Sequence, residues 1–371
     1  MIDKVVDRVT GADPVAQSQW ALIWRRFRRH RVAQTSLYVL GILYLVCVLF
    51  PEFFAPYGQH EQFDGKYFPP QRLHFVDADG VFHIRPFGYG FKQSLDRKTL
   101  ELTVKPVTDS RYPISLFVRG TEYKLWGLIN TDVHFFGLED GGRIFLFGTD
   151  RLGRDLFSRT LYACRISLTI GFMGVFVSFV LGLVVGGLSG LLGGVVDEAI
   201  QRVIEMLMSI PQIPLWMALA AAVPREWSPI QVYFAITVIL SIIGWTGLAR
   251  VVRSKFISLR EEDFVAAAVA YNAPITTIIG RHLIPNFVSY VIVSITLSIP
   301  LMILAETSLS FLGIGLRPPV VSLGVLLERA QRFQTVALYP WMLIPGAFVV
   351  VVVLAFNFVG DGLRDAADPY R

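Results

Sequence analysis

Long apolar stretches recur along the chain and are separated by more polar segments. A helix needs about 20 predominantly apolar residues to cross the hydrocarbon core of a bilayer. Stretches of roughly this length predict a bundle of transmembrane helices. The six predicted spans are Ser36–Phe54, Ile166–Leu192, Ile200–Val223, Ile230–Leu248, Phe287–Leu304 and Trp341–Val359.

A second pattern, with a period of two residues, occurs in the segment 55–147 between the first two spans. Apolar positions alternate over Leu73–Phe87 around Asp79-Gly80, a dipeptide typical of a β-hairpin turn. Thr99–Val107 and Tyr112–Gly120 are predicted to be further strands, each bounded by Pro, Asp or Gly. About 90 residues are enough for a small core, so we expect a small β-rich domain here, which serves either as a structural cap over the pore or as a docking surface for an external partner.

The polar segment before the fifth span has helical rather than strand character. Phe264–Tyr271 is rich in alanine and is predicted to be a helix. Asn272 tolerates the left-handed conformation that ends a helix, and Pro274 cannot continue it. A second helix is predicted over Pro274–Leu283, and Pro285 marks the start of the fifth span. The segment is too polar to span a bilayer, so we expect a helix-turn-helix outside it; an amphipathic hairpin resting on lipid headgroups is the alternative.

The composition agrees with a membrane protein. Hydrophobic residues make up 53% of the 371 residues, charged residues only 17%, and the mean hydropathy is +0.53. Soluble domains are about a quarter charged. Cys47 and Cys164 form no metal or disulfide framework. Cys47 is expected to be a small apolar residue within its span, and a disulfide between the two is the less favoured reading.

The distribution of basic residues predicts the orientation. Trp24–Arg31 is a dense basic cluster ahead of the first span, and such clusters hold that end of a span in the cytoplasm. About 35 residues precede the apolar run and no A-x-A site follows it, which favours a retained anchor over a cleaved signal peptide. Six crossings return the C-terminus to the cytoplasm. They also place the basic segment 250–286 inside and the segment 55–147 outside.

The segment Phe264–Asn286 resembles the EAA loop of permease subunits in ABC importers, the loop that docks on the ATPase. Two positions differ from the family pattern, since Ala266 stands where most members have Glu and Asn272 where they have Gly. Glu262, one turn earlier, could supply a carboxylate from the same helix face. The matching residues are Ala267, Ala268, Arg281, His282, Pro285 and Asn286.

Four other stretches are similar to dipeptide and oligopeptide permeases in particular. Together they extend over most of the length of Phe147–Arg371, whereas Ala55–Leu146 lies outside the resemblance because most members have a much shorter loop there. One of them has Glu205 in place of the family's second Asp. The four stretches are Phe147–Gly171, Asp197–Leu215, Ala305–Pro319 and Gly360–Pro369.

The resemblance implies a polytopic all-α membrane protein of the type I ABC importer permease architecture. It divides the chain into a cytoplasmic basic segment (1–35), a first helix (36–54), an external β-rich insert (55–147) and a permease core (148–371) with the coupling loop 250–286. The implied location is the bacterial inner membrane, with both termini in the cytoplasm.

The resemblance also implies the function and the partners. The implied function is the ATP-driven import of short peptides delivered by an external solute-binding protein, with opines or oligosaccharides as alternative cargo. The implied partners are a second homologous permease and two cytoplasmic ATPases, which bind ATP and Mg²⁺. The chain has no phosphate-loop motif, and it is expected to carry no cofactor, no metal and no catalytic residue and to bind no nucleic acid.

Two groups of residues are candidate functional sites under this resemblance. The residues expected to contact the ATPase are Phe264, Ala266, Ala267, Ala268, Tyr271, Asn272, Arg281, His282 and Pro285. An external motif before the second span is expected to form a hydrogen-bonded turn at the pore entrance, with contact to cargo or binding protein as the alternative. Its residues are Gly148, Asp150, Gly153, Arg154, Asp155 and Arg159.

Two further features come from the residues themselves. Glu306 is a pore candidate because an ionisable group at membrane depth is often functional, and a satisfied structural carboxylate is the alternative. Arg202 and Glu205, spaced i,i+3 on one helix face, are expected to form an ion pair.

Two other classes of protein fit the sequence less well. A proton-driven secondary transporter needs ionisable groups near the middle of its spans, and the stretch Ile166–Gly187 contains none. A membrane-anchored enzyme needs a catalytic set in its external domain. The histidines there have no metal-binding spacing; they are His60, His74, His83 and His134.

Overall fold

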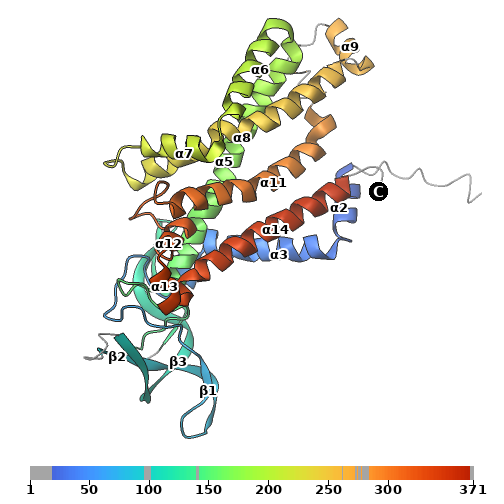
Figure 1. Cartoon of the computed structure of the whole chain (residues 1–371). Coiled ribbons are helices and arrows are strands. Elements are labelled where there is room, and N and C mark those ends of the chain that lie inside the picture. Colours follow the sequence, from blue (N-terminus) through green and yellow to red (C-terminus); the bar gives the residue numbers. More distant parts are fainter. Residues whose placement is uncertain are drawn as a thin grey trace, which may run out of the picture.

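A bundle of long helices with a β-sheet at one end forms the described part of the chain (Figure 1). The computed structural model describes residues 19–95, 102–138, 142–260, 262–271, 274, 277 and 284–367. The first helices are α2 (Gln19–Phe27), α3 (Arg31–Leu43), the π-helical η1 (Tyr44–Leu49) and α4 (Pro51–Phe54). The strands are β1 (His74–Val76), β2 (Phe82–Leu95), β3 (Leu102–Leu125) and β4 (Ile129–Leu138). The later helices are α5 (Leu156–Leu192), α6 (Gly194–Ser209), α7 (Gln212–Ala221), α8 (Pro229–Arg260), α9 (Asp263–Ala270), α11 (Ile284–Phe311), α12 (Leu323–Glu328), α13 (Phe333–Leu338), the 3-10 turn η3 (Pro340–Leu343) and α14 (Ile344–Ala367).

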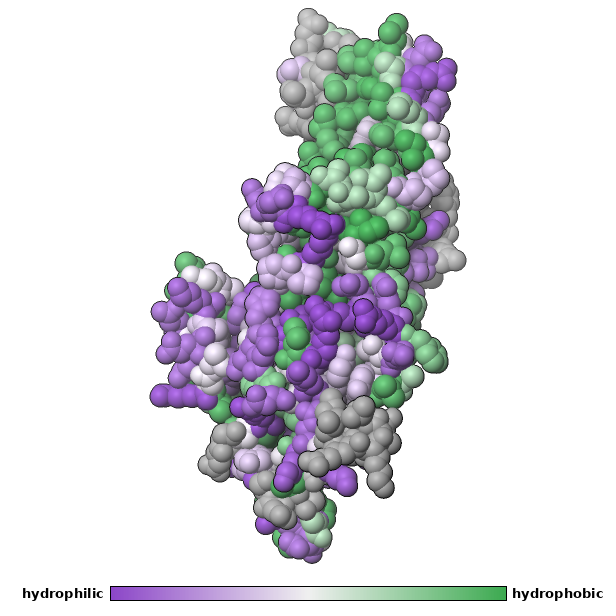
Figure 2. All heavy atoms as spheres, turned by 60° about the vertical axis from the view of Figure 1, so that its left-hand side comes forward, coloured by the Kyte–Doolittle hydropathy of each residue, from purple (hydrophilic) through white to green (hydrophobic). Residues whose placement is uncertain are grey.

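Within the described residues, five helical segments are long and apolar enough to cross a membrane, and a bent pair of helices makes up to six. The five segments overlap the first, second, fourth, fifth and sixth predicted spans and mostly extend beyond them. Figure 2 shows that hydrophobic surface covers the helical part of the molecule, whereas hydrophilic surface gathers over the end that carries the strands.

The third predicted span is wrong as a single helix. The apolar pattern predicts one span over Ile200–Val223, but the chain forms α6 and α7, which meet at an angle of 87°. Ile210 is extended, with φ −88° and ψ 129°, and Pro211 follows it. A proline disfavours the helical conformation of the residue before it and lacks the N–H that would continue the ladder, so the helix breaks here.

The long helices pack against one another in the order α3, α14, α11, α5 and α8. α3 lies against α14, α14 against α11, α11 against α5, and α5 against α8, and α5 crosses the others in Figure 1. Small residues permit the closest of these contacts. A Cβ added at Gly186 of α5 would lie 2.4 Å from the carbonyl oxygen of Ala249 on α8, so the two backbones touch without an intervening side chain.

The sheet is an antiparallel meander in the order β1-β2-β3-β4. The predicted hairpin at Asp79-Gly80 is confirmed, since it joins β1 to β2 with Gly80 at φ +81°. Asp77 Oδ1 accepts hydrogen bonds from the backbone N–H groups of Asp79 and Val81 and so holds the turn.

The two later predicted strands, Thr99–Val107 and Tyr112–Gly120, are not separate. Both contribute to the single strand β3, which the structure describes from Leu102 onward. The register of β3 against β2 shifts between Tyr89 and Gly90, which pair with Arg111 and Val107. Such a bulge absorbs extra residues and bends a strand without ending it.

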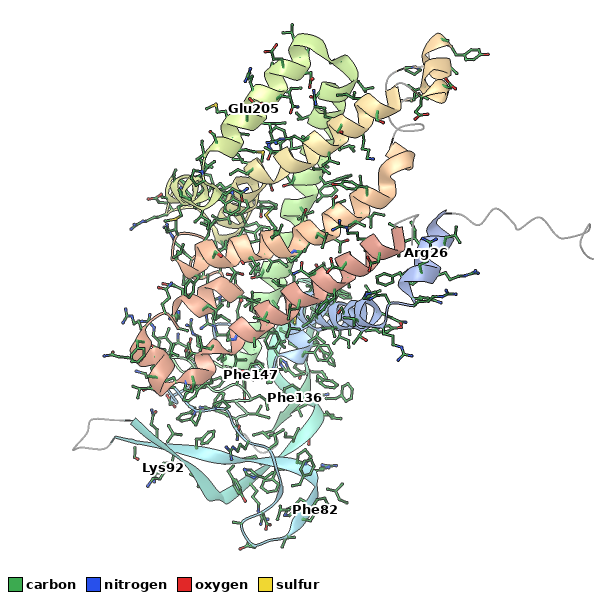
Figure 3. The ribbon with its side chains drawn as sticks, turned by 45° about the vertical axis from the view of Figure 1, so that its right-hand side comes forward. Arg26, Phe82, Lys92, Phe136, Phe147 and Glu205 are labelled. Atoms are coloured by element: carbon green, nitrogen blue, oxygen red, sulfur yellow. The ribbon has the colours of Figure 1, made fainter. Side chains whose placement is uncertain are left out.

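Aromatic side chains join the sheet to the helices. Trp126 Nε1 donates to the carbonyl oxygen of Leu49, the last residue of the first helical span, at 2.7 Å. Phe136 and Phe147, both labelled in Figure 3, contact the ring of Phe157 on α5, with centroids 5.7 and 5.0 Å away. The sheet is therefore fixed to the start of α5 rather than tethered by a loose linker.

The contact between α5 and α8 predicts a packing-sensitive position. Gly186→Ala forces a methyl group into the backbone of α8, and overpacking of this kind costs about 1–3 kcal/mol. We expect a lower midpoint in thermal unfolding of the detergent-solubilised protein. Gly41→Ala on α3 is the control, because a Cβ there meets nothing within 4 Å. Equal midpoints for both variants would contradict the close backbone contact.

Candidate functional site

The external motif forms a tight turn immediately before α5. Gly148 and Gly153 have φ of +76° and +72°, a region that favours glycine. A Cβ at Gly148 would lie 2.3 Å from the carbonyl oxygen of Phe68, and one at Gly153 would lie 1.9 Å from that of Phe63. Both glycines are therefore required by conformation and by the close approach of the segment that leads into the sheet.

Thr149 fastens this turn to the same segment. Its Oγ1 donates to the carbonyl oxygen of Gly65 and accepts from the N–H of Phe68, both at 2.8 Å. The backbone N–H of Thr149 donates to the carbonyl oxygen of Phe68 at 2.9 Å. The turn and the chain before the sheet thus form one hydrogen-bonded unit.

Asp150 is the charged centre of the turn and is 1% exposed. Its Oδ2 accepts hydrogen bonds from Arg154 Nε at 2.8 Å and Nη2 at 2.6 Å, and it also pairs with Arg159 Nη1. Burial alone would raise the pKa of Asp150, but the hydrogen bonds from Arg154 and the charge of Arg159 outweigh it and hold the pKa below its ordinary value.

Asp155 is the N-cap of α5. Its Oδ2 accepts from the backbone N–H of Ser158 at 2.7 Å, which is why the helix begins at Leu156 rather than at the predicted Ile166. The side chain is buried, and Oδ1 has no hydrogen-bond partner among the described residues. Burial raises the pKa of Asp155 to about 7, although the hydrogen bonds from Ser158 oppose the rise.

The structure brings the six residues of the external motif together, and their four charged side chains are buried. The exposed fractions of Asp150, Arg154, Asp155 and Arg159 lie between 1% and 7%. Side chains that pair with one another in the interior are not free to bind cargo. This geometry favours the turn interpretation of the motif.

Helix α9 carries the described part of the predicted ATPase-contacting segment. Val265 is 1% exposed and packs in a cluster with Val252, Phe256 and Val291 of α8 and α11. Ala267 and Ala270 are exposed, and Tyr271, which follows the helix, is 87% exposed. One face of α9 is thus fixed to the bundle, and the other is free.

Other predicted contact residues lie outside what the structure describes. Pro285 falls in the first turn of α11, which begins at Ile284. The remaining residues lie outside the described residues, either entirely or in their side chains; they are Phe264, Ala266, Ala268, Asn272, Arg281 and His282. Most of the predicted second helix, Pro274–Leu283, also lies outside them.

Glu306 lies on α11, is 0% exposed and is held by hydroxyl groups. Its Oε2 accepts from Ser167 Oγ of α5 at 2.9 Å, and its Oε1 accepts from Ser310 Oγ at 2.8 Å. Ser167 Oγ also accepts from the N–H of Leu323 at the start of α12 at 3.2 Å. The carboxylate thereby links three helices, and this geometry favours the structural interpretation; the pore role stays a prediction.

Two ion pairs lie toward the other end of the bundle. Arg202 and Glu205 pair at 3.1 Å as predicted, on an exposed face of α6. Sequence reasoning missed the pair between Asp197 and Arg253, whose Nη2 donates to Oδ2 at 2.5 Å and ties α6 to α8. The available signals were the family-like stretch that contains Asp197 and the basic character of the segment that contains Arg253.

The cysteines are both free and buried. Cys164 lies within hydrogen-bonding reach of Cys47, so the two thiols are neighbours in the contact between η1 and α5. The two residues form no disulfide, and Cys47 packs as the small apolar residue that its span predicted.

A cavity of about 480 Å³, the helix cavity, lies between α5, α7, α8 and α11. Its wall is mostly apolar, with Trp216, Leu240 and Leu301 among the lining residues. Hydroxyl and amide groups are spread over it and come from four helices; its polar lining residues are Ser178, Gln212, Thr246, Tyr290, Ser294 and Ser298. Glu306 is not among the lining residues. Sequence analysis missed this cavity. The available signal was the four-residue spacing of Tyr290, Ser294 and Ser298, which places all three on one face of α11.

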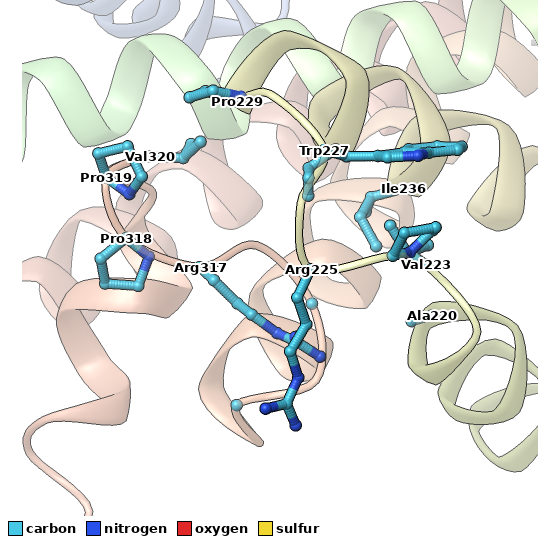
Figure 4. Close-up of a pocket in the computed structure, with 14 residues that line it drawn as sticks. Ala220, Val223, Arg225, Trp227, Pro229, Ile236, Arg317, Pro318, Pro319 and Val320 are labelled. Carbon is cyan, nitrogen blue, oxygen red and sulfur yellow. The ribbon is translucent and has the colours of Figure 1, made fainter.

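A second cavity of about 480 Å³, the arginine pocket, adjoins the loops that follow α7 and α11 (Figure 4). It is lined by Arg225, Trp227, Pro229, Arg317, Pro318 and Pro319, together with Ala220, Val223 and Ile236. Sequence analysis missed this pocket, because Arg225 and Arg317 lie far apart in the chain.

Long apolar helices around a cavity, with a helix projecting at one end, define a polytopic membrane protein of the transporter class. A family model described as a binding-protein-dependent transport system inner membrane component matches residues 178–370. A second model, described as the N-terminal TM domain of oligopeptide transport permease C, matches residues 18–70. The chain belongs to this family of inner membrane transport components and is a multi-pass protein of that membrane.

Individual relatives agree with the family. The oligopeptide transport system permease protein OppC of Haemophilus influenzae is 41% identical over 224 residues, which cover 60% of this chain and 70% of that protein. The dipeptide transport system permease protein DppC of Lactococcus lactis is 32% identical over 349 residues, or 93% of this chain and 89% of that protein. A solved structure of the MetNI methionine ABC transporter, in an inward-facing conformation, aligns with a TM-score of 0.43 and 20% identity, and covers 57% of this chain and 97% of that chain.

The pKa of Asp155 predicts a pH dependence of stability. Between about pH 4, the ordinary value for Asp, and about pH 7, the folded protein holds a proton that the unfolded chain releases. Stability therefore falls as the pH rises through this window. Asp155→Asn keeps the cap acceptor but cannot ionise. We therefore expect the Asn variant to unfold at a higher temperature than the wild type at pH 8, and to lose the fall in stability that this carboxyl group causes between about pH 4 and about pH 7.

The control is Asp155→Ala, which also cannot ionise but removes the cap, at a cost of about 0.5–2 kcal/mol. Thermal unfolding of the solubilised protein between pH 4 and pH 8 measures all three proteins. An Asn variant with the wild-type pH profile would contradict a raised pKa at this position.

Proposed function

We propose that this chain is the transmembrane permease subunit of an ATP-driven ABC importer for short peptides that an external solute-binding protein delivers. The observation that carries the proposal is helix α9, with Val265 buried against α8 and α11 and its opposite face exposed. A helix held in this way can receive a partner and transmit its movement to the helices that line the helix cavity. The relatives named as oligopeptide and dipeptide permeases support the choice of cargo.

A second homologous permease completes the pore. The helix cavity is open at one side, where apolar Leu301 is 68% exposed and Tyr290 is 43% exposed. A polar translocation path needs a wall of protein rather than lipid at this side. The second subunit supplies that wall, and the serine and threonine hydroxyls of the helix cavity face the peptide on its way through.

The charges at the end away from the strands support the proposed orientation. α2, α9 and the C-terminal end of α14 lie on the right-hand side of Figure 1, away from the strands. Basic residues gather at the end formed by α2 and the C-terminal part of α8, and basic residues favour the cytoplasm; they are Arg25, Arg26, Arg28, Arg29, Arg250, Arg253 and Lys255. Both termini then face the cytoplasm, and the sheet lies outside as the β-rich insert of residues 55–147.

Transport proceeds by alternating access. Two cytoplasmic ATPases bind ATP and Mg²⁺, and their closure displaces α9. Because Val265 packs against both α8 and α11, the displacement reaches two walls of the helix cavity together. This chain makes and breaks no covalent bond, and its role in the transport cycle is to change conformation.

The exposed surface of α9 predicts the effect of a charge on the ATPase contact. Ala267→Asp leaves the permease folded, because the position is exposed in the isolated chain, but places a carboxylate in a desolvated interface. An unpaired buried charge costs about 3–5 kcal/mol. We expect most of the ATPase to be lost when the complex is purified in detergent, and peptide-stimulated ATP hydrolysis to fall with it.

Ala267→Ser is the matched control, since it is small, polar and uncharged at the same position. It is expected to retain the ATPase and the stimulation. If the Asp variant binds and couples like the Ser variant, α9 does not contact the ATPase and rests on the membrane surface instead.

The β1–β2 hairpin is proposed as a contact for the solute-binding protein. Phe75, Phe82 and Ile84 form an exposed apolar group at its end, which we call the tip patch, and their exposed fractions are 49%, 66% and 88%. Phe82 and Ile84 lie on the same face of β2, because side chains two residues apart along a strand point the same way. The ring of Phe82 stacks on that of Phe75. An apolar group exposed so far from the helices fits a partner better than it fits a cap on the pore.

The tip patch predicts a defect that is specific to the binding protein. Phe82→Ser with Ile84→Ser removes apolar contacts worth about 1.5–3 kcal/mol per buried side chain. We expect a rise of tenfold or more in the concentration of binding protein that gives half-maximal uptake in proteoliposomes. Leu128→Ser is the control, because that residue is 83% exposed on the β3–β4 turn, beside the helices. Unchanged half-saturation in the double variant would leave the sheet as a cap.

A further inference from the structure

The arginine pocket contains two cationic side chains with no anionic partner. Arg225, from the loop after α7, and Arg317, from the loop after α11, both line it, and in Figure 4 their guanidinium groups point to the same side. Neither forms an ion pair with any residue that the structure describes. Two like charges at one cavity repel each other unless an anion lies between them.

The backbone adds to the positive potential. The 32-residue helix α8 begins at Pro229, which lines the pocket, so the positive end of its dipole faces the same space. Glu226 and Glu328 are the nearest acidic residues along these segments, and neither is among the lining residues. Glu328 Oε1 lies 3.9 Å from the position of a Cβ at Gly313, which does line the pocket. Two guanidinium groups and a helix N-terminus outweigh this carboxylate, so the net potential of the pocket is positive.

The remaining walls are apolar and rigid. Trp227, Pro318 and Pro319 line the same pocket as the arginines, and the volume of about 480 Å³ falls within the range of small-molecule sites. A pocket with cationic groups on one side and an aromatic ring and prolines on the others suits a small ligand that carries one anionic group beside apolar atoms.

The position of the pocket relates it to the transport path. Ala220 and Ile236 line the arginine pocket, whereas Trp216 and Leu240 line the helix cavity. Each pair lies four residues apart on one helix, α7 or α8, which is about one helical turn. The arginine pocket therefore lies one turn beyond the helix cavity, on the side of the loops that the proposed orientation places outside.

We propose that the arginine pocket binds the C-terminal carboxylate of the peptide cargo as the peptide leaves the binding protein. Arg225 and Arg317 each offer a guanidinium fork that matches a carboxylate in a bidentate manner. The side chain of the last residue lies against Trp227 and the prolines, and the rest of the peptide continues into the helix cavity. This inference rests on the proposed function, and it adds a selective step within the membrane subunit.

Cargo is a better occupant than an acidic side chain of the binding protein. The site is a concave space that adjoins the helix cavity, whereas a docking contact needs an accessible surface. The tip patch, which is convex and apolar, is the surface of that kind on the sheet.

The test compares the uptake of trialanine with that of trialanine amide, which lacks the carboxylate. The complete importer is reconstituted in proteoliposomes, and the affinity of the binding protein for each peptide is measured first so that both are delivered at saturation. The variant Arg225→Gln with Arg317→Gln removes both charges. Arg332→Gln is the control, because Arg332 is exposed near α13 and does not line the pocket.

We expect the wild type and Arg332→Gln to take up trialanine about tenfold or more faster than its amide, as the loss of charge-assisted hydrogen bonds implies. In the double Gln variant this ratio falls toward one, while uptake of the amide stays unchanged. Arg225→Lys with Arg317→Lys keeps the charge but not the fork, and an intermediate ratio supports the bidentate contact.

Three results would overturn the inference, the third of them together with the proposed function. A ratio that is the same in the double Gln variant and in the wild type removes the pocket from cargo recognition. An equal loss of uptake for both peptides, with a higher half-saturation for the binding protein, assigns the arginines to the binding protein instead. A wild type that imports neither peptide contradicts the proposed function itself, and the inference with it.

Discussion

The buried carboxylate of Asp150 is the interaction on which the arrangement of the helices depends. It compensates Arg154 and Arg159, which are 7% and 2% exposed and which would be costly to bury without a counter-charge. The carbonyl oxygen of Asp150 also accepts a hydrogen bond from the N–H of Tyr67, in the segment before the sheet. One residue thus fixes both the first turn of α5 and the chain that leads into the strands, and α8 and α11 then pack on α5 to enclose the helix cavity.

The sequence predicted the location of the spans because the ability to cross a bilayer depends mainly on the length of an apolar run. It did not predict where helices end. α5 begins ten residues before the apolar run, since Asp155 caps it, and α8 continues past Leu248 into polar residues that are good helix formers. The helix break at Ile210 was not predicted either, because the average hydropathy stays high across Pro211 although the backbone turns through 87° there.

The candidate sites differed in how far they could be predicted. Local features could be predicted, because the external motif and α9 each lie within one short stretch. Residue types alone indicated the turn at Gly148 and the helix over Phe264–Tyr271. Sites assembled from distant segments could not be predicted in this way. The polar groups of the helix cavity come from four helices, and only those of α11 follow a helical spacing. The arginine pocket joins Arg225 to Arg317 from two loops far apart in the chain, and although Arg317 lies within a family-like stretch, no local pattern pairs the two residues.

The length of α5 has a mechanical consequence. Its 37 residues rise by about 55 Å at 1.5 Å per residue, well beyond the roughly 30 Å of the hydrocarbon core. One end is clamped by the Asp150 cluster, and near the other Gly190 touches the backbone of Arg253, the partner of Asp197. The helix is therefore a stiff rod that projects into both aqueous phases. A tilt that opens one end of the bundle must displace the other end in the opposite direction, so the two sides of the membrane cannot be gated independently by this subunit.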